Sequence, residues 1–494
     1  MDLWQDFTFP LILLITFLLF LLLRGYKAEL GNLPPGPHPL PLLGNLLQLR
    51  GPSLLRSLLV LRETYGPVFT IYLATQRVVV LCGYEVVKEA LVDQAEEFSA
   101  REGLAIAERT SKGNGLFFSN GETWRQLRRF AISTLRNFGM GKRSIEERIQ
   151  EEIQYLLEEF RKKKGTPLDP NFVLRRSVSN VICSVVFGSR FSYEDEEFQT
   201  LLSLIQENFR RVDTLWVQLY NLFPAVMRHL PGPHNRLFEN FEEQKRYVAG
   251  VVQKHKETLD PSSPRDYTDA FLIRMQQEES NPDTKFHHEN LLLSALDLFF
   301  AGTETTSTTL RYGLLVLLKY PDVTERIQEE IERVIGQDRS PCMEDRTKMP
   351  YTDAVIHEIQ RFIDIIPLGV PHSVTGDTQF RGYTIPKGTT VLPILNSVLH
   401  DPTQFADPET FNPRHFLDET GGFKKNAAFM AFSAGKRACP GEGLARMELF
   451  LFFTAILQSF TISSPACPED IDITPEYQGF GKVPRGYRLC LIPR

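Results

Sequence analysis

The residues best suited to chemistry in this chain surround one cysteine near the C-terminus. Cys439 follows the basic pair Lys436 and Arg437 and lies between Gly435 and Gly441, in the run F-S-A-G-K-R-A-C-P-G. Basic neighbours and a following helix favour the thiolate form of a cysteine, which is the form that binds metals. The glycines permit a tight turn whose backbone N–H groups point at the sulfur. A lone cysteine is more often a small buried residue, but this context predicts a metal-bound thiolate at Cys439.

A second polar group interrupts a long apolar helical pattern over 286–320. The run A-G-T-E-T-T at 301–306 places a glycine and three threonines in mid-helix, where they are poor helix formers. A threonine hydroxyl there can bond a preceding carbonyl or a water and open the helix locally. The alternative is a packing glycine beside satisfied hydroxyls, and this run alone does not separate the two.

Two further pairs of residues have helical spacing. Trp124 and Arg128 are four residues apart, and Glu358 and Arg361 are three apart, so each pair shares a helix face. Most exposed pairs of this kind contribute little to stability. Their meaning therefore depends on the elements around them.

Composition excludes several classes of protein. A chain of 494 residues with 42% hydrophobic content can bury a large core. Charged residues make up 23% and the net charge is -6, which indicates neither disorder nor a nucleic-acid-binding protein. The six cysteines form no C-x-x-C pair, so neither a zinc ribbon nor a thioredoxin site is expected. Their wide scatter favours reduced thiols over a disulfide framework.

The N-terminus has the features of a membrane anchor. The run from Phe7 to Leu23 is uncharged and mostly apolar, at the short end for a bilayer span. A cleaved signal peptide is the alternative, but the leading segment carries Asp2 and Asp6 and no basic residue, and no A-x-A pattern follows. Arg24 and Lys27 lie just after the run, which predicts a cytosolic location for the rest of the chain.

The remaining chain predicts a mainly α globule with a smaller β portion. β-branched runs predict paired strands at 68–73 and 78–81. Helices are expected at 144–164, 286–320, 321–335, 351–362 and 443–460. We therefore expect three parts: a membrane anchor over 1–23, a basic and proline-rich linker over 24–41 that acts as a stiff spacer, and a catalytic domain over 42–494.

The cysteine run resembles a known family signature. F-x-x-G-x-R-x-C-x-G is the haem-binding signature of the cytochromes P-450, and the chain matches it at every fixed position. The runs L-P-P-G-P at 33–37, G-M-G-K-R-S-I-E-E-R-I-Q-E-E at 139–152 and M-P-Y-T-D-A-V-I-H-E-I-Q-R at 349–361 resemble family two of the vertebrate microsomal enzymes, nearest to its A, B, F and G subfamilies. The resemblance implies the cytochrome P-450 fold with an N-terminal transmembrane anchor. It also implies haem b as the cofactor, with an axial thiolate from Cys439 on its iron.

The resemblance implies roles for the other motifs. Thr305, with the acid Glu304 beside it, delivers protons to dioxygen at the haem. Basic and aromatic side chains bind the haem and its propionates: Arg101, Trp124, Arg128, His372 and Arg437. Glu358 and Arg361 form a buried structural pair, and His415 replaces the arginine that is usual in the third position, because the stretch P-E-R-F is here N-P-R-H-F.

Two further sets of residues follow from the same resemblance. The positions that line the substrate cavity in similar enzymes are all apolar here: Leu104, Phe118, Phe209, Val212, Phe300, Ala301, Ile366, Val370 and Phe480. Such a cavity binds by removing apolar area from water and accepts many small lipophilic molecules. The positions on the surface that meets redox partners are basic: Arg125, Arg129, Arg136, Lys142, Lys436 and Arg446.

The expected activity is that of a microsomal, unspecific monooxygenase, which inserts one oxygen atom of O₂ into small lipophilic substrates: xenobiotics, steroids, fatty acids or odorant-like molecules. No G-x-G-x-x-G follows a predicted strand, so the electrons of NADPH must arrive through a separate NADPH–cytochrome reductase, with cytochrome b5 as a second partner. The expected location is the endoplasmic reticulum membrane, with the catalytic domain facing the cytosol. A haem-thiolate isomerase or dehydratase is one alternative, against which Glu304 and Thr305 argue. A non-catalytic haem sensor or carrier is the other.

Overall fold

The β-branched runs near the N-terminus form the sheet that the sequence predicts. In this computed structural model, β1 (Val68–Leu73) and β2 (Gln76–Cys82) pair antiparallel, with Val68 opposite Leu81. β6 (Thr390–Ile394) runs parallel to β2, and β3 (His372–Ser373) pairs antiparallel with β6. The sheet order is therefore β1-β2-β6-β3.

The structure describes residues 16, 32–49, 53–101, 104–138 and 143–494, and they fall into two compact units. The smaller unit holds the sheet and combines the chain up to Gly103 with Val370–Ile394. Its other elements are α2 (Leu54–Tyr65), α3 (Tyr84–Lys88), the π-helical turn η1 (Glu89–Asp93), β4 (Thr378–Phe380) and β5 (Tyr383–Ile385).

The larger unit combines Leu104–Gly369 with Leu395–Arg494 and is mainly helical. Its α-helices are α4 (Ala105–Ser111), α5 (Gly121–Asn137), α6 (Arg143–Lys162), α7 (Asn171–Val186), α8 (Glu196–Arg211), α9 (Leu215–Leu222), α10 (Pro224–Met227), α11 (Asn235–Thr258), α12 (Tyr267–Gln277), α13 (His288–Lys319), α14 (Pro321–Val334), α15 (Pro350–Ile363), α16 (Asn396–Leu399) and α17 (Glu442–Ser459). Its 3-10 turns are η2 (Asp345–Lys348), η3 (Pro413–Phe416), η4 (Gly435–Arg437) and η5 (Pro468–Asp470). Two hairpin-like pairs complete it, β7 (Phe460–Ser463) with β10 (Cys490–Pro493) and β8 (Pro475–Gln478) with β9 (Lys482–Pro484).

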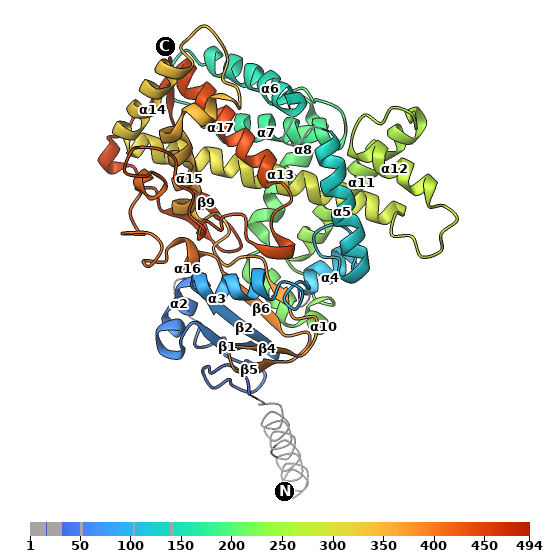
Figure 1. Ribbon diagram of the computed structural model, residues 1–494. Coiled ribbons are helices and arrows are strands. Elements are labelled where there is room, and N and C mark those ends of the chain that lie inside the picture. The colour runs from blue at the N-terminus through green and yellow to red at the C-terminus, as the bar shows by residue number, and fades with distance from the viewer. Residues whose placement is uncertain (1–15, 17–31, 50–52, 102–103, 139–142) are drawn as a thin grey trace, which may run out of the picture. The chain divides into compact units, whose positions relative to one another are not determined.

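The helix α13 forms the centre of the larger unit. It runs through this unit with α7, α15 and α17 packed beside it (Figure 1). Its sequence is apolar on almost every side, as expected of a helix surrounded by other elements. The packing against α17 is close: a Cβ at Gly313 would lie 2.3 Å from Cζ of Phe453. One large hydrophobic core spans the helices of this unit.

The five predicted helices are confirmed as α6, α13, α14, α15 and α17, each within two residues of its predicted ends. The expected local opening in the run at 301–306 is wrong, because α13 is helical without interruption from His288 to Lys319. The predicted bond from a hydroxyl to a preceding carbonyl is confirmed, because the hydroxyls of Thr305, Ser307 and Thr309 donate to the carbonyl four residues earlier. This bond satisfies the hydroxyl without removing the backbone bond of the helix.

The predictions for the N-terminal region have different outcomes. The predicted anchor lies outside the described residues, Thr16 excepted, and in the described part of the chain no helix is long and apolar enough to cross a bilayer. The predicted end of the spacer at residue 41 is wrong, because residues before it already belong to the folded part. The backbone N–H of Thr70 donates to the carbonyl of Pro35 at 2.8 Å, and Pro34 and Pro37 are buried. A proline-rich strand lacks donors but keeps its carbonyls, so it can still bond the outer edge of β1. The folded part therefore begins before Pro34.

Candidate functional site

The cysteine loop presents backbone N–H groups to its sulfur. Cys439 follows η4, and its own N–H donates to the carbonyl of Phe432 at 3.0 Å, which closes the turn. Burial, together with the charge of Glu442, raises the pKa of the Cys439 thiol above its ordinary value. Hydrogen bonds from the N–H groups of Gly441 and Glu442 at the start of α17, and the charge of Arg128, oppose this rise. The side chain is nevertheless exposed. The sulfur is thus enclosed by protein on the loop side and accessible on the other, as a metal ligand must be.

The helix α5 and the cysteine loop share a basic cluster. The guanidinium of Arg128 donates to the carbonyl of Ala438, next to the cysteine. Arg437 lies 3.9 Å from the ring centre of Trp124 and donates to the carbonyl of Ser119 at 2.8 Å. The buried Nε1 of Trp124 has no hydrogen-bond partner among the described residues.

This cluster fits the carboxylates of a haem. A buried indole N–H usually finds an acceptor, and here it lies beside two arginine side chains. The predicted residues Trp124, Arg128 and Arg437 are therefore together, next to Cys439. Their donors suit an anionic group, and the accessible thiol suits its metal.

Thr305 lies on the one accessible face of an otherwise buried helix. Between Asn290 and Leu318, every residue of α13 is buried except Asp297, Phe300, Ala301, Gly302 and Thr305. Asp297, Ala301 and Thr305 are each four residues apart and Phe300 lies beside them, so these four share one face. Gly302 lies to one side of this face, against Ile182 of α7. The Oγ1 of Thr305 donates to the carbonyl of Ala301 at 2.6 Å.

Glu304 points to a different neighbour. Its Oε1 lies 3.1 Å from Nε of Arg175 on α7, poorly aligned for a hydrogen bond, and Nη2 of Arg175 donates to its Oε2 at 3.4 Å. Burial raises the pKa of the Glu304 carboxyl, and the charge of Arg175 opposes that shift. The structure thus pairs Glu304 with Arg175, and it records no contact between the side chains of Glu304 and Thr305 in the described part of the chain.

Glu358 and Arg361 form a fully buried ion pair on α15. Nε and Nη2 of Arg361 donate to the two carboxylate oxygens of Glu358 at 2.7 and 2.8 Å, and both side chains have 0% exposure. Arg361 also donates to the carbonyls of Leu399, Pro408 and Thr410. Nδ1 of His415 lies 3.1 Å from the Glu358 carboxylate, so the histidine occupies the third position of this network.

The two remaining residues predicted to bind the haem propionates belong to the smaller unit. Arg101 donates to the carbonyls of Val370 and Pro371 at 2.8 and 2.6 Å. Nδ1 of His372 lies 2.7 Å from the carbonyl of Phe98. Both side chains are buried there.

Three of the predicted substrate-cavity residues are in contact. The ring centre of Phe209 lies 6.2 Å from that of Phe300 and 6.4 Å from that of Phe480. Phe118 contacts the ring of Phe117, and Val212 packs against the cluster around Val217. All nine predicted residues except the buried Phe209 are half-buried, and Val370 belongs to the smaller unit, apart from the other eight.

The predicted basic surface is present in part. Arg125, Arg129 and Arg136 are exposed along α5, and Lys436 is exposed on the cysteine loop. Arg446 is not exposed but half-buried. Its guanidinium donates to Glu442 at 2.9 Å and lies 2.5 Å from Nε2 of His357. Lys142 lies outside the described residues.

The sequence reasoning missed a clamp between α13 and the segment 115–120. Oδ2 of Asp297 accepts the N–H groups of Leu116 and Phe117 at 2.8 and 3.0 Å, and Oδ1 of Asn290 accepts that of Gly115 at 2.9 Å. Burial raises the pKa of Asp297 to about 7, against the effect of these N–H groups. The sequence signal for this clamp was Asp297 itself, because an acidic residue within a mostly apolar helix needs a partner.

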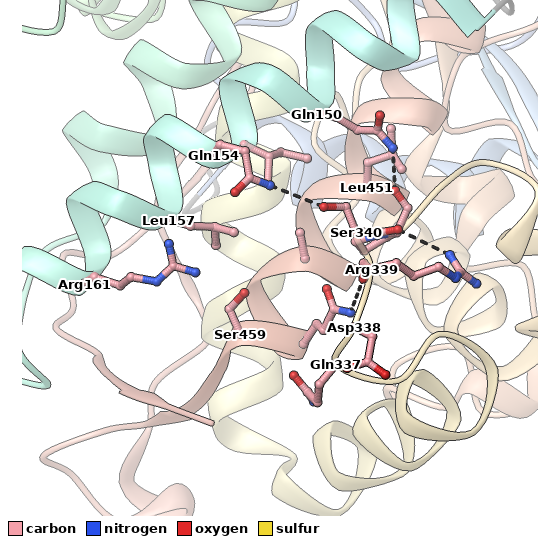
Figure 2. A pocket seen from close by; sticks show the side chains of 14 residues that line it. Gln150, Gln154, Leu157, Arg161, Gln337, Asp338, Arg339, Ser340, Leu451 and Ser459 are labelled. Atoms are coloured by element: carbon pink, nitrogen blue, oxygen red, sulfur yellow. Dashed lines mark hydrogen bonds between the residues drawn. The ribbon is translucent and has the colours of Figure 1, made fainter.

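A surface cavity lies apart from these residues. It has a volume of about 210 Å³ and is lined by α6, α17 and the loop at 337–341, as Figure 2 shows. Gln150 donates to the carbonyl of Pro341, and Gln458 to those of Gly336 and Arg339. Since none of the predicted site residues lines this cavity and its amide groups bond the protein itself, it has no role in the chemistry of Cys439.

Comparison with known proteins agrees with this geometry. The family profile of cytochrome P450 matches residues 34–491. Cytochrome P450 2B4 of Oryctolagus cuniculus is 57% identical over 489 residues, which cover 98% of this chain and 100% of that protein. Cytochrome P450 2G1 of the same species is 57% identical over 494 residues, with both chains fully covered, and cytochrome P450 2F3 of Capra hircus is 55% identical over 98% of this chain and 99% of its own. The predicted match to family two is confirmed, and the chain belongs to the cytochrome P450 family of haem-thiolate monooxygenases.

Proposed function

We propose that this protein is a microsomal monooxygenase of small lipophilic molecules, with Cys439 as the haem ligand. The observation that carries the proposal is the accessible face of α13, with Thr305 on a helix that is buried everywhere else in its central part. A helix with a purely structural role at the centre of a unit is expected to be covered on all sides. A helix that borders a reaction site must leave one side accessible to the substrate.

Cys439 would hold the haem iron through its thiolate, which the N–H groups at the start of α17 and the charge of Arg128 would stabilise. Trp124, Arg128 and Arg437 would donate to the propionates. Haem bound in this way activates dioxygen, so that one oxygen atom enters the substrate and the other leaves as water. Hydrogen bonds to the sulfur set the electron donation of a thiolate ligand.

Thr305 is the residue that holds a proton-bearing group at the reaction site. Its hydrogen atom is donated to the carbonyl of Ala301, so its oxygen remains an acceptor for a water molecule. Glu304 serves as the proton reserve behind it, because burial keeps its pKa raised. The ion pair with Arg175 must loosen before this carboxyl exchanges a proton with water.

Apolar side chains select the substrate. Phe209 contacts both Phe300 and Phe480, and Phe300 shares the accessible face of α13 with Thr305. None of the nine proposed lining residues carries a charge or a strong hydrogen-bonding group. Binding therefore follows apolar area, which favours xenobiotics, steroids, fatty acids or odorant-like molecules.

Electrons come from NADPH through a separate reductase. The exposed residues Arg125, Arg129, Arg136 and Lys436 offer positive charge on α5 and on the cysteine loop. A surface of this kind attracts an acidic partner such as the reductase or cytochrome b5. The proposed location is the endoplasmic reticulum membrane, with the N-terminal run as the anchor and the catalytic domain in the cytosol.

Reconstitution tests the proposal. Purified protein, haem, reductase and NADPH are incubated under ¹⁸O₂ with a terpene, a steroid and a small aromatic compound. We expect hydroxylated product that carries one ¹⁸O atom and requires both reductase and NADPH. Rearrangement of a hydroperoxide without reductase, in the absence of any hydroxylation, would establish the isomerase alternative instead.

A further inference from the structure

The hairpin of β8 and β9 has its tip fixed by one carboxylate from a distant part of the chain. The tip consists of Gly479, Phe480 and Gly481. The backbone N–H of Phe480 donates to Oδ2 of Asp213 at 2.7 Å. Asp213 lies two residues after Arg211, the last residue of α8, and precedes α9.

The two glycines of the tip make this contact possible. A Cβ at Gly479 would lie 2.1 Å from Cγ of Asp213, and a Cβ at Gly481 would lie 2.5 Å from Cζ of Phe209. Real Cβ atoms do not approach other atoms so closely, so any other residue at position 479 or 481 would push the side chain of Asp213 or Phe209 away. The tip is thus seated on the C-terminal end of α8 by close contact as well as by a hydrogen bond.

The strand β9, which follows the tip, is held separately at both of its ends. The N–H of Lys482 donates to the carbonyl of Ile365 at 2.9 Å, and Nζ of Lys482 lies 3.3 Å from Oδ2 of Asp364. At the other end, Asp472 pairs with Arg485 at 3.0 Å, with both side chains about half exposed. Loss of the Asp213 contact would therefore release the tip and leave β9 in place.

We propose that Asp213 is a positioning residue that determines substrate size, because it holds Phe480 against Phe209 beside the reaction site. This inference rests on the proposed function, in which Phe209, Phe300 and Phe480 line the substrate site. With the tip seated, the Phe480 ring limits the space above Phe209 and favours compact molecules. With the tip released, compact molecules lose contact area and bulky ones gain room.

Two ligands that share one binding group test this inference. 4-Phenylimidazole is compact and clotrimazole is bulky, and both bind haem iron through an imidazole nitrogen. The ratio of their dissociation constants, from spectral titration of the full-length haem protein, reports the space around the ligand and cancels the metal bond. We expect Asp213→Ala to shift this ratio about tenfold in favour of the bulky ligand, the effect of losing one charged hydrogen bond. Asp213→Asn keeps an acceptor oxygen and should shift the ratio less.

The variants Phe480→Ala and Asp213→Ala/Phe480→Ala separate the possible outcomes. If Asp213 acts through Phe480, its substitution has no further effect once the ring is removed. A ratio that Phe480→Ala changes but Asp213→Ala does not would overturn the role of Asp213. A ratio that Phe480→Ala leaves unchanged would remove Phe480 from the substrate site, and the inference would fall with that part of the proposed function.

Hydrogen exchange of the ligand-free protein gives a second readout. Asp213→Ala and Asp213→Asn should raise exchange in the peptide that contains Phe480, and leave the peptide with Lys482 and Val483 protected. Asp472→Ala is the matched control, because it removes a carboxylate from the same hairpin at its base. Unchanged exchange at the tip in both Asp213 variants would also contradict the inference.

Discussion

The hydroxyl of Thr305 donates a 2.6 Å hydrogen bond to the carbonyl of Ala301, one helical turn earlier, on the accessible face of α13. The bond fixes the rotamer of Thr305 and directs its lone pairs away from the helix backbone. The same bond recurs at Thr309, which donates to the carbonyl of Thr305 at 2.8 Å but is buried. The two threonines thus share a local geometry and differ in access to the reaction site.

This difference predicts the effect of Thr305→Ala. The substitution preserves the helix and removes only the hydroxyl, so haem and substrate should still bind. The reaction site loses its ordered proton donor, and electrons leave as hydrogen peroxide or superoxide. General acid effects of this kind are worth roughly a hundredfold or more. The measurement is the ratio of product formed to NADPH consumed, with Thr309→Ala as the control, and an equal ratio in wild type and Thr305→Ala would make Thr305 a packing residue.

Asp297 predicts a pH dependence of stability. Burial raises its pKa from 3.8 to about 7, so between these values the folded chain keeps a proton that the unfolded chain releases. The contribution of Asp297 to the free energy of unfolding is therefore complete below the unfolded pKa and falls as pH rises toward 7, by at most about 1.4 kcal/mol for each pH unit. Asp297→Asn should remove this fall.

The measurement is the unfolding midpoint of wild type and Asp297→Asn across this pH window. Asp345→Asn is a control of opposite sign, because hydrogen bonds from Arg339 lower the pKa of Asp345 despite its burial. The stability that Asp345 contributes is present above its unfolded pKa and is lost as pH falls. Parallel curves for wild type and Asp297→Asn would show that Asp297 is ionised throughout.

The buried pair on α15 predicts a large loss of stability in Glu358→Gln. Arg361 would keep its charge with 0% exposure and without a counter-ion. Removal of one partner of a buried ion pair typically costs about 3–5 kcal/mol. Glu442→Gln is the control, because its pair with Arg446 is 41% exposed on the glutamate side. Thermal unfolding measures both, and equal small shifts would mean that Arg361 is stabilised by its carbonyl acceptors alone.

Much of the site follows from local sequence. The spacing of residues along one helix places Trp124 beside Arg128 and Glu358 beside Arg361, and a contiguous run defines the loop around Cys439. The partners that come from distant segments cannot be predicted from local sequence. Asp297 accepts N–H groups 180 and 181 residues away, and Arg175 meets Glu304 across 129 residues.

The same limit applies to the fold. The strand β6 joins β2 in parallel from a segment more than 300 residues later, so the sequence could not predict that the smaller compact unit combines two distant parts of the chain. The hydrophobic periodicity of α13 predicted its length but not its accessible face. That face depends on which neighbouring elements leave Phe300, Ala301 and Thr305 partly exposed, and no local sequence pattern indicates it.

The central claim is that the sulfur of Cys439 binds the haem iron. A thiolate ligand shifts the absorption band of the ferrous carbonyl complex far to the red. We expect that band in the wild type and in Cys467→Ser, which alters another exposed cysteine. Cys439→Ser should lose the band, whether or not haem remains bound. A red-shifted carbonyl band of wild-type intensity in Cys439→Ser would contradict the assignment.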